Sequence, residues 1–160
     1  MSVESEKIRI DRVNLKEIKE LVEVYKDAYA ELEEYAYTSR SNIKGYLKWL
    51  YKRDPMGFFV AYFKNRPVGF ISVDSRWYSV DKGVLLGEIH EVVVIREFQG
   101  KGIGKRLFET GLSYLKSKGI KNLELWVGEN NRRARKFYRK YGFKEVEKRW
   151  DWVRMTKKLD

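Results

Sequence analysis

The sequence predicts an α/β fold in which a mixed β-sheet of the α+β type carries helices on both faces. Short runs of β-branched and aromatic residues alternate with longer segments whose apolar residues recur at helical spacing. The expected order of elements is β-α-α-β-β-β-α-β-α-β-β, with the strands clustered around two late helices. The chain has 160 residues and no repeat, linker or low-complexity segment, so a single domain over residues 1–160 is expected.

The first third of the chain is expected to supply one strand and two helices. A short strand is predicted over residues 6–11, and Asn14 can cap the helix that follows it. A second helix is predicted to start at Ser41 or Asn42 and to run to about Arg53. A proline and a glycine follow closely, and they favour the end of this helix.

The middle of the chain is expected to form a hairpin and one buried strand. Residues 58–63 and 68–73 are typical of strands, and residues 64–67 between them are typical of a hairpin turn. Residues 74–83 are expected to form a polar loop. Residues 88–95 have the density of β-branched side chains that indicates a buried strand.

The last third of the chain is expected to add two helices and three strands. The predicted bounds are residues 103–118 and 131–142 for the helices, and residues 122–127, 143–146 and 150–155 for the strands. Asn131 is placed to cap the second of these helices, and Gly142 is placed to end it.

Composition narrows the function classes. There is no cysteine, which excludes disulfides and thiolate chemistry. No apolar run is long enough to span a membrane and no signal-peptide core is visible, so a cytoplasmic protein without a membrane partner is expected. The net charge is +11, and residues 81–160 hold 20 Lys and Arg against 11 Asp and Glu, a net of +9. This basic half indicates an anionic ligand, either a phosphorylated cofactor or nucleic acid.

The turn between the buried strand and the next helix is the clearest binding signal. It reads Gln99-Gly100-Lys101-Gly102-Ile103-Gly104, with Lys105 and Arg106 directly after it. The first amides of a helix lack internal partners and the helix dipole favours anions there, so a phosphate or pyrophosphate is expected to bind. A plain tight turn is the alternative, because the spacing matches neither a P-loop nor a dinucleotide fingerprint.

Two motifs of this chain resemble those of the GCN5-related N-acetyltransferase (GNAT) superfamily, in the same order and at the same separation. The pyrophosphate loop of the family reads Q/R-x-x-G-x-G/A, which matches the glycine turn. Its second motif reads N-x-x-A-x-x-F/L-Y-x-x-x-G-F, and the matching residues here are Asn131, Ala134, Phe137, Tyr138, Gly142 and Phe143. The resemblance implies the acyl-CoA N-acyltransferase fold with splayed central strands, and an acetyl-CoA-dependent N-acetyltransferase.

The resemblance also implies where acetyl-CoA would bind, with no metal required. The implied cofactor-binding residues are Val92, Val93 and Val94 before the turn, Gln99, Gly100, Lys101, Gly102, Ile103, Gly104 and Lys105 in and after it, and Asn131 and Tyr138 from the second motif. In the family, the pantetheine lies between two splayed strands, and a backbone amide there can hold the developing oxyanion. Core packing for the valines and helix capping for Asn131 remain alternatives.

Transfer to an amine needs a base for the amine proton and an acid for the departing thiolate. Tyr138 matches the tyrosine acid of the family, although a core tyrosine would fit the same position. Glu88 and His90 match base positions of two family branches, and strand alternation puts them on one face, which favours them over Glu91. An imidazole titrates near neutrality, whereas Glu88 would need a raised pKa or a relay water. Structural hydrogen bonding is the alternative for both.

The acceptor is expected to be a small-molecule or peptide amine. Glu31, Glu33 and Glu34 lie on the element that lines the acceptor cleft in the family, which favours a cationic acceptor, although a solvated helix end explains them too. Trp77 and Tyr78 in the predicted loop suggest an acceptor site or a subunit contact, so a homodimer stays open. An acyl-CoA-binding module without turnover is one alternative function. Nucleic-acid binding is another and is disfavoured, because no recognised motif accompanies the basic residues.

Overall fold

The structure is a computed structural model that describes residues 7–79 and 83–159. Its strands form one mixed sheet in the order β1-β2-β3-β4-β5-β7-β6. Their bounds are Arg9–Arg12 for β1, Phe58–Phe63 for β2, Arg66–Tyr78 for β3, Leu85–Val94 for β4, Asn122–Gly128 for β5, Lys144–Arg149 for β6 and Trp152–Lys158 for β7. Only the β4–β5 pair is parallel among the described strands.

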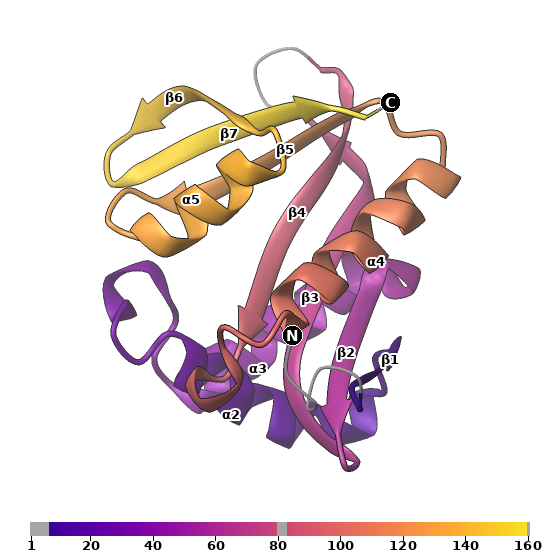
Figure 1. The fold of residues 1–160 in the computed structure, drawn as a ribbon, viewed down its shortest axis with the longest axis vertical. Helices are drawn as coiled ribbons and strands as arrows, with labels where there is room; N and C mark the ends of the chain where they lie inside the picture. The colour runs from indigo at the N-terminus through magenta and orange to yellow at the C-terminus, as the bar shows by residue number, and fades with distance from the viewer. Residues whose placement is uncertain (1–6, 80–82, 160) are drawn as a thin grey trace.

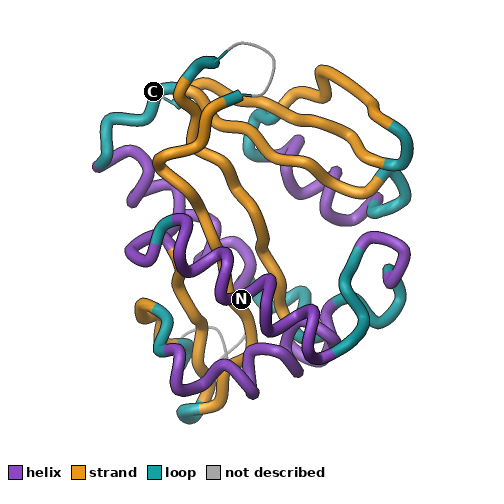
Figure 2. Tube along the Cα trace, turned by 180° about the vertical axis from the view of Figure 1, so that it is seen from behind, coloured by secondary structure: helices purple, strands orange, loops and turns teal. Residues whose placement is uncertain are grey.

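Four α-helices accompany the sheet in the described part of the chain. They are α2 (Ile18–Ala28), α3 (Arg40–Arg53), α4 (Ile103–Ser117) and α5 (Arg132–Lys140), and short 3₁₀ turns include η1 (Leu15–Glu17) and η2 (Glu33–Tyr35). Figure 1 shows α4 and α5 in front of the sheet, and Figure 2 shows α2 and α3 crossing its other face. The predicted mixed sheet with helices on both faces is confirmed.

The core lies between the sheet and these helices. Leu47 of α3, Phe70 of β3 and Leu107 and Phe108 of α4 are fully buried, and each such side chain contributes about 1.5–3 kcal/mol by leaving water. The approach of α4 to β3 is close at Gly111, where an added Cβ would lie 2.8 Å from Ile71 Cδ1. No helix in residues 7–79 or 83–159 has the length and apolar character needed to cross a membrane.

Two local predictions need correction. The predicted polar loop over residues 74–83 is wrong in its first half, because β3 continues to Tyr78 and pairs there with β4; residues 80–82 lie outside the described residues. The buried Asp74 explains the misreading, since an acid inside a strand resembles a loop residue until its partners are known. The helix predicted from Ser41 or Asn42 begins at Arg40, because the Ser39 side chain accepts from the Asn42 amide and caps it.

The parallel strands β4 and β5 separate part-way along their length. They pair only through residues 87–89 of β4 and residues 123–125 of β5. Figure 1 shows β4 continuing down one side of the molecule while β5 fans away from it with β7 and β6. Residues 90–94 therefore keep β3 as a partner on one side and have no strand partner on the other.

A β-bulge lies on β4 where the separation begins. Ser72 of β3 is opposite Glu91, but the next residue, Val73, is opposite Ile89, so His90 is an extra residue on β4. An extra residue interrupts the alternation of side chains between the two faces. As a result His90 and Glu91 both contact side chains of the α2–α3 layer.

Candidate active site

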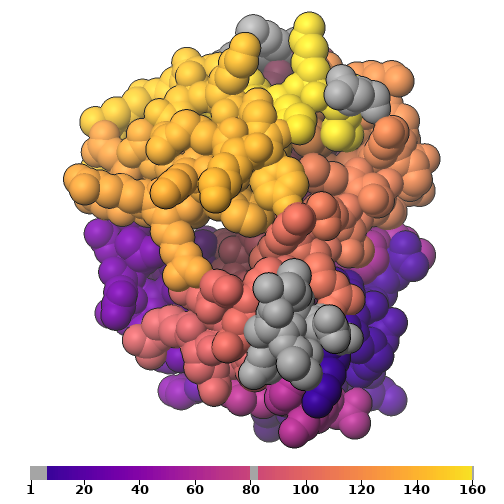
Figure 3. Space-filling model, viewed as in Figure 1, coloured from indigo at the N-terminus to yellow at the C-terminus, as the bar shows by residue number. Residues whose placement is uncertain are grey.

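The separation of β4 and β5 opens a cleft on the side of α4 and α5. A cavity of about 700 Å³ occupies it, bounded by the end of β4, the glycine turn and α5. Figure 3 shows the hollow between the C-terminal part of the chain and the segment around residue 100. A volume of this size suits a cofactor rather than a single small ion.

The glycine turn forms one wall of this cleft with its amides uncommitted. Gly100 and Gly102 have φ values of +78° and +83°, which glycine adopts without strain, and Gly102 is the N-cap of α4. Among the described residues, no carbonyl accepts a bond from the amides of residues 100–105; the first amide of this stretch to find one is that of Arg106, bonded to Gly102. These donors and the N-terminus of α4 form an anion site.

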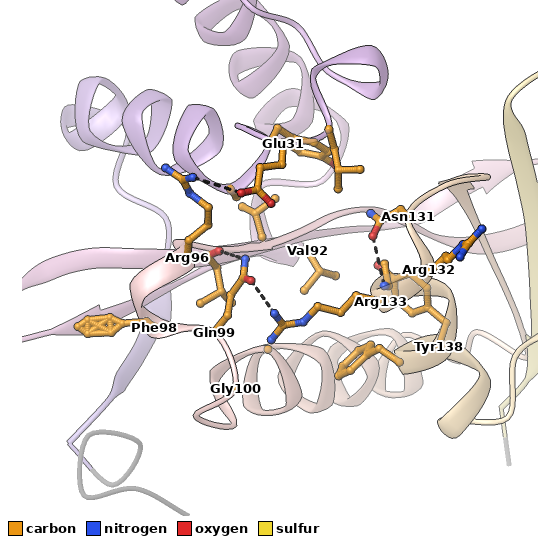
Figure 4. Close-up of a pocket in the computed structure, with 18 of the residues that line it drawn as sticks. Glu31, Val92, Arg96, Phe98, Gln99, Gly100, Asn131, Arg132, Arg133 and Tyr138 are labelled. Carbon is orange, nitrogen blue, oxygen red and sulfur yellow. Dashed lines mark hydrogen bonds and ion pairs between the residues drawn. The ribbon is translucent and has the colours of Figure 1, made fainter.

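Gln99 holds the turn to both sides of the cleft. Its Nε2 donates to the Val94 carbonyl at 2.9 Å, and its Oε1 accepts from Nη1 of Arg133 at 2.8 Å. Figure 4 shows the Arg133 side chain reaching from α5 across the cleft to Gln99. A second guanidinium, that of Arg132, also lines the cavity. The cleft therefore carries positive charge on the α5 side as well.

Tyr138 lies where the cleft narrows toward the point of strand separation. It is buried on α5 against the rings of Phe108, Phe137 and Phe143. Its hydroxyl makes no hydrogen bond to another described residue, although the ring lines the cavity. Burial, and next the nearby charge of Glu91, raise the pKa of Tyr138 above its ordinary value. The hydroxyl stays protonated at neutral pH and is free to donate.

Glu91 occupies the other side of the separated strands. Its two carboxylate oxygens accept from the hydroxyls of Tyr29 on α2 at 2.7 Å and Tyr46 on α3 at 2.9 Å. Burial raises the pKa of Glu91 to about 7, while the two phenol donors lower it and limit the rise. The carboxyl group is therefore close to half ionised at neutral pH, which is the condition for a general base.

Glu91 and Tyr138 meet at a second, smaller cavity of about 50 Å³. The two cavities share wall residues, among them Val92, Asn131 and Tyr138. The smaller one extends toward the opposite side of the sheet, where aromatic residues of η2, β5 and β7 surround it. The gap between β4 and β5 thus connects a large cleft with a narrow aromatic cavity.

Glu88 and His90, the two predicted bases, have other partners. Glu88 is buried beside Glu124 on the paired part of the sheet and lines neither cavity; burial, and then the hydrogen bond with Glu124, raise its pKa to about 11. His90 Nε2 lies 3.0 Å from Asp74 Oδ2, and the imidazole ring packs between Trp49 and Trp77. The alternation argument for preferring them to Glu91 does not hold, because the bulge brings Glu91 to their face.

A family model described as the acetyltransferase (GNAT) family matches residues 18–143. The chain belongs to this family. A protein of Archaeoglobus fulgidus, described as an uncharacterized N-acetyltransferase, is 43% identical over 131 residues, which are 82% of this chain and 89% of that protein. The GNAT assignment made from the two sequence motifs is confirmed, and with it the expectation of an acetyltransferase.

Solved structures agree with the GNAT fold. The structure of PH1933 from Pyrococcus horikoshii OT3 has a TM-score of 0.87 and 43% identity, covering 96% of this chain and 99% of its own. The PaiA N-acetyltransferase of Thermoplasma acidophilum, in complex with coenzyme A, has a TM-score of 0.77 and 24% identity, covering 99% and 100%. The second likeness speaks for the fold alone.

The structure brings most of the expected GNAT cofactor residues to one cleft. Its lining includes Val92, Val93, Val94, Gln99, Gly100, Gly102, Gly104, Lys105, Asn131 and Tyr138. Ile103 instead packs in the core, and the Lys101 side chain is not part of the lining. Asn131 caps α5 by accepting from the Ala134 amide at 3.3 Å, as its capping alternative required. Capping leaves the two amide hydrogens of Asn131 available to a ligand.

Sequence reasoning passed over Glu91 and gave Arg133 no role in the cleft. Nothing in the local pattern of β4 shows the bulge, because the residues around it alternate no differently from those of a regular strand. For Arg133, the signal was its position inside the second motif, two residues after Asn131. That position puts the arginine on the first turn of α5, which faces the cleft.

The remaining expectations concern the rim. Glu31, Glu33 and Glu34 are exposed, and Glu31 lies 3.9 Å from Arg96 at the edge of the large cleft. Trp77 packs on Trp49 and His90, while Tyr78 is 61% exposed. The acidic rim is consistent with a cationic acceptor and does not select one.

Proposed function

We propose that this chain is an acetyl-CoA-dependent N-acetyltransferase that transfers an acetyl group to a primary amine by direct attack on the thioester. One observation carries the proposal. The gap between β4 and β5 joins an anion-binding turn and a large cleft on one side to Glu91 and Tyr138, a carboxyl and a phenol of suitable protonation state, on the other.

The residues of the large cleft fit coenzyme A. The unbonded amides of residues 100–105 suit a pyrophosphate, since they are fixed donors at a helix N-terminus. Lys105, Arg132 and Arg133 supply full charges beside them. The unpaired edge of residues 90–94 offers backbone donors and acceptors to an extended pantetheine arm. The complex of PaiA N-acetyltransferase with coenzyme A supports this choice of cofactor.

Acetyl-CoA supplies an activated two-carbon acyl group, and this chain's residues handle the protons. Glu91, ionised, accepts the proton that the amine nitrogen loses as its new bond to carbon forms. An amide on the unpaired edge of residues 92–94 donates to the thioester oxygen while that oxygen carries negative charge. Tyr138 donates its hydroxyl proton to the sulfur as the carbon–sulfur bond breaks, so the thiol leaves uncharged. A proton passed from Glu91 to Tyr138 through solvent restores both groups.

Glu91 is preferred to Glu88 and His90 on position and on chemistry. It alone of the three carries a carboxylate into the cavity that Tyr138 also lines. Glu88, with a pKa of about 11, holds its proton at neutral pH and cannot accept another. His90 directs Nε2 to the Asp74 carboxylate. Asp74 in turn is held by Arg53 Nε at 2.7 Å, which suits a structural pair.

Acceptor-dependent release of thiol from acetyl-CoA tests the proposal. The chain contains no cysteine, so a thiol-reactive dye reports coenzyme A alone. We expect release that rises with amine concentration in the wild type. Gly102→Asp is expected to abolish both release and cofactor binding, because a carboxylate would occupy the anion site. Wild-type protein that binds acetyl-CoA and releases thiol at the same slow rate with and without every amine would instead be a binding module.

A further inference from the structure

The smaller cavity restricts the acceptor by its size, and this inference rests on the proposed function. About 50 Å³ is available between the strands. A buried water needs roughly 10–15 Å³ by such a measure, so the space holds about four water-sized groups. An amino nitrogen with two or three carbons in line fills it. An amine whose first carbon carries two substituents does not fit.

The walls of this cavity are suited to an ammonium group. Its lining includes four aromatic rings, those of Tyr29, Tyr35, Trp126 and Trp152, together with the Glu91 carboxyl. No lysine or arginine is part of the lining. Aromatic faces attract a cation, most strongly when water is excluded. A protonated amine can therefore enter before Glu91 takes its proton.

Tyr35 closes the outer side of the cavity, and little space lies behind it. The ring of Tyr35, the last residue of η2, lies so close to Gly128 of β5 that an added Cβ there would be 2.5 Å from it. The ring meets that of Trp152 edge-on at 5.3 Å, and its hydroxyl accepts from the Asn130 amide at 2.9 Å. The side chain is only 9% exposed. This aromatic wall is held in place from three sides.

We infer that the acceptor is an unbranched primary alkylamine, such as the end of a polyamine or a lysine side chain, and that Tyr35 and Trp152 set this limit. An α-amino group of a peptide carries both a side chain and a carbonyl on its first carbon. It is therefore excluded by the same wall. The acidic rim of Glu31, Glu33 and Glu34 favours cationic molecules that carry such an end.

The test compares 1-aminobutane with its branched isomer 2-aminobutane in the thiol-release assay. The two amines have the same atoms and closely similar basicity, so the ratio of their kcat/KM values reports shape. We expect the wild type to prefer the linear isomer by about 30-fold or more, as a tight pocket does for one misplaced carbon. Tyr35→Ala is expected to lower this ratio at least tenfold. Tyr35→Phe, which keeps the ring, is expected to preserve the ratio.

Trp152→Leu opens the same wall from β7 and is expected to lower the ratio in the same direction. It also carries the test where Tyr35→Ala fails to fold, which thermal unfolding shows. Lysine amides blocked at either nitrogen distinguish the sources. The Nα-blocked amide offers the ε-amine and is expected to react faster, although the free α-amine of the Nε-blocked amide is less basic and thus more often neutral.

Two results would overturn the inference while leaving the proposed function intact. One is equal turnover of linear and branched amines by the wild type. The other is an unchanged ratio in both wall variants. If no amine produced acceptor-dependent thiol release in any variant that binds acetyl-CoA, the proposed function itself would fall, and the inference with it.

Discussion

Two carboxyl groups on β4 lie three residues apart and have opposite surroundings. Glu88 lies where β4 pairs with β5, directly across from Glu124, and its pKa is raised to about 11. Glu91 lies beyond the point of separation, between two phenol hydroxyls, and its pKa is raised only to about 7. Burial acts on both. The difference comes from the neighbours, since a second carboxyl favours the protonated form and phenol donors favour the ionised form.

The comparison shows what strand separation does for this fold. In the paired region, Glu124 also accepts from Arg154 Nη1 at 3.0 Å, so the buried polar groups satisfy one another and remain structural. In the separated region, β4 keeps only one partner strand, and polar groups face a cavity instead of each other. A buried acid becomes available for chemistry only in the second situation.

The largest expected effect contrasts these two acids directly. Glu91→Gln keeps the shape of the side chain but removes the base, so kcat/KM should fall by about 100-fold at pH 7. Glu88→Gln keeps a hydrogen-bond donor toward Glu124 and should change kcat/KM by less than about threefold. Thiol release with saturating acetyl-CoA measures both. The reverse order of effects would restore Glu88 as the base and remove the contrast.

A smaller effect is expected at Tyr138, on the other wall of the separated region. Tyr138→Phe preserves the ring packing on Phe108 but leaves the sulfur without a donor, so kcat should fall by about tenfold to 100-fold. The dissociation constant for coenzyme A, measured by titration calorimetry, should change by less than about threefold. Equal losses in turnover and in affinity would show that the hydroxyl serves packing or binding alone.

The difference between the two regions also explains what the sequence could predict. Hydrophobic periodicity and the two motifs located the sheet, the glycine turn and Tyr138, because these depend on local pattern. The bulge at His90 and the length of β3 depend on pairing between strands far apart in sequence. The same holds for Glu91, whose pKa and orientation are set by Tyr29 and Tyr46, 62 and 45 residues away.

A third prediction concerns stability in the paired region. The pKa of Glu88 is raised from 4.5 to about 11, so between these values the folded state holds a proton that the unfolded state has released. The free energy of unfolding must then fall as pH rises, by up to about 1.4 kcal/mol per pH unit for one proton. Urea unfolding from pH 6 to pH 9 measures this slope. Glu88→Gln has no such proton and should show a flatter dependence, and parallel slopes for the two proteins would contradict the pairing with Glu124.

The smallest expected effect adjusts Glu91 through its donors. Tyr46→Phe removes one of the two hydrogen bonds that favour the ionised carboxylate, so the pKa of Glu91 should rise above about 7 by about half a unit. Because the base acts ionised, kcat/KM should rise with pH in both proteins, but in the variant the rise should come at higher pH. The activity at pH 6.5 should then fall by about threefold while that at pH 9 is retained. The titration of the acceptor is common to both profiles, so the displacement between them belongs to the protein. Tyr51→Phe, on the same helix but without a bond to Glu91, is the matched control, and an equal displacement in that variant would separate the pH dependence from Glu91.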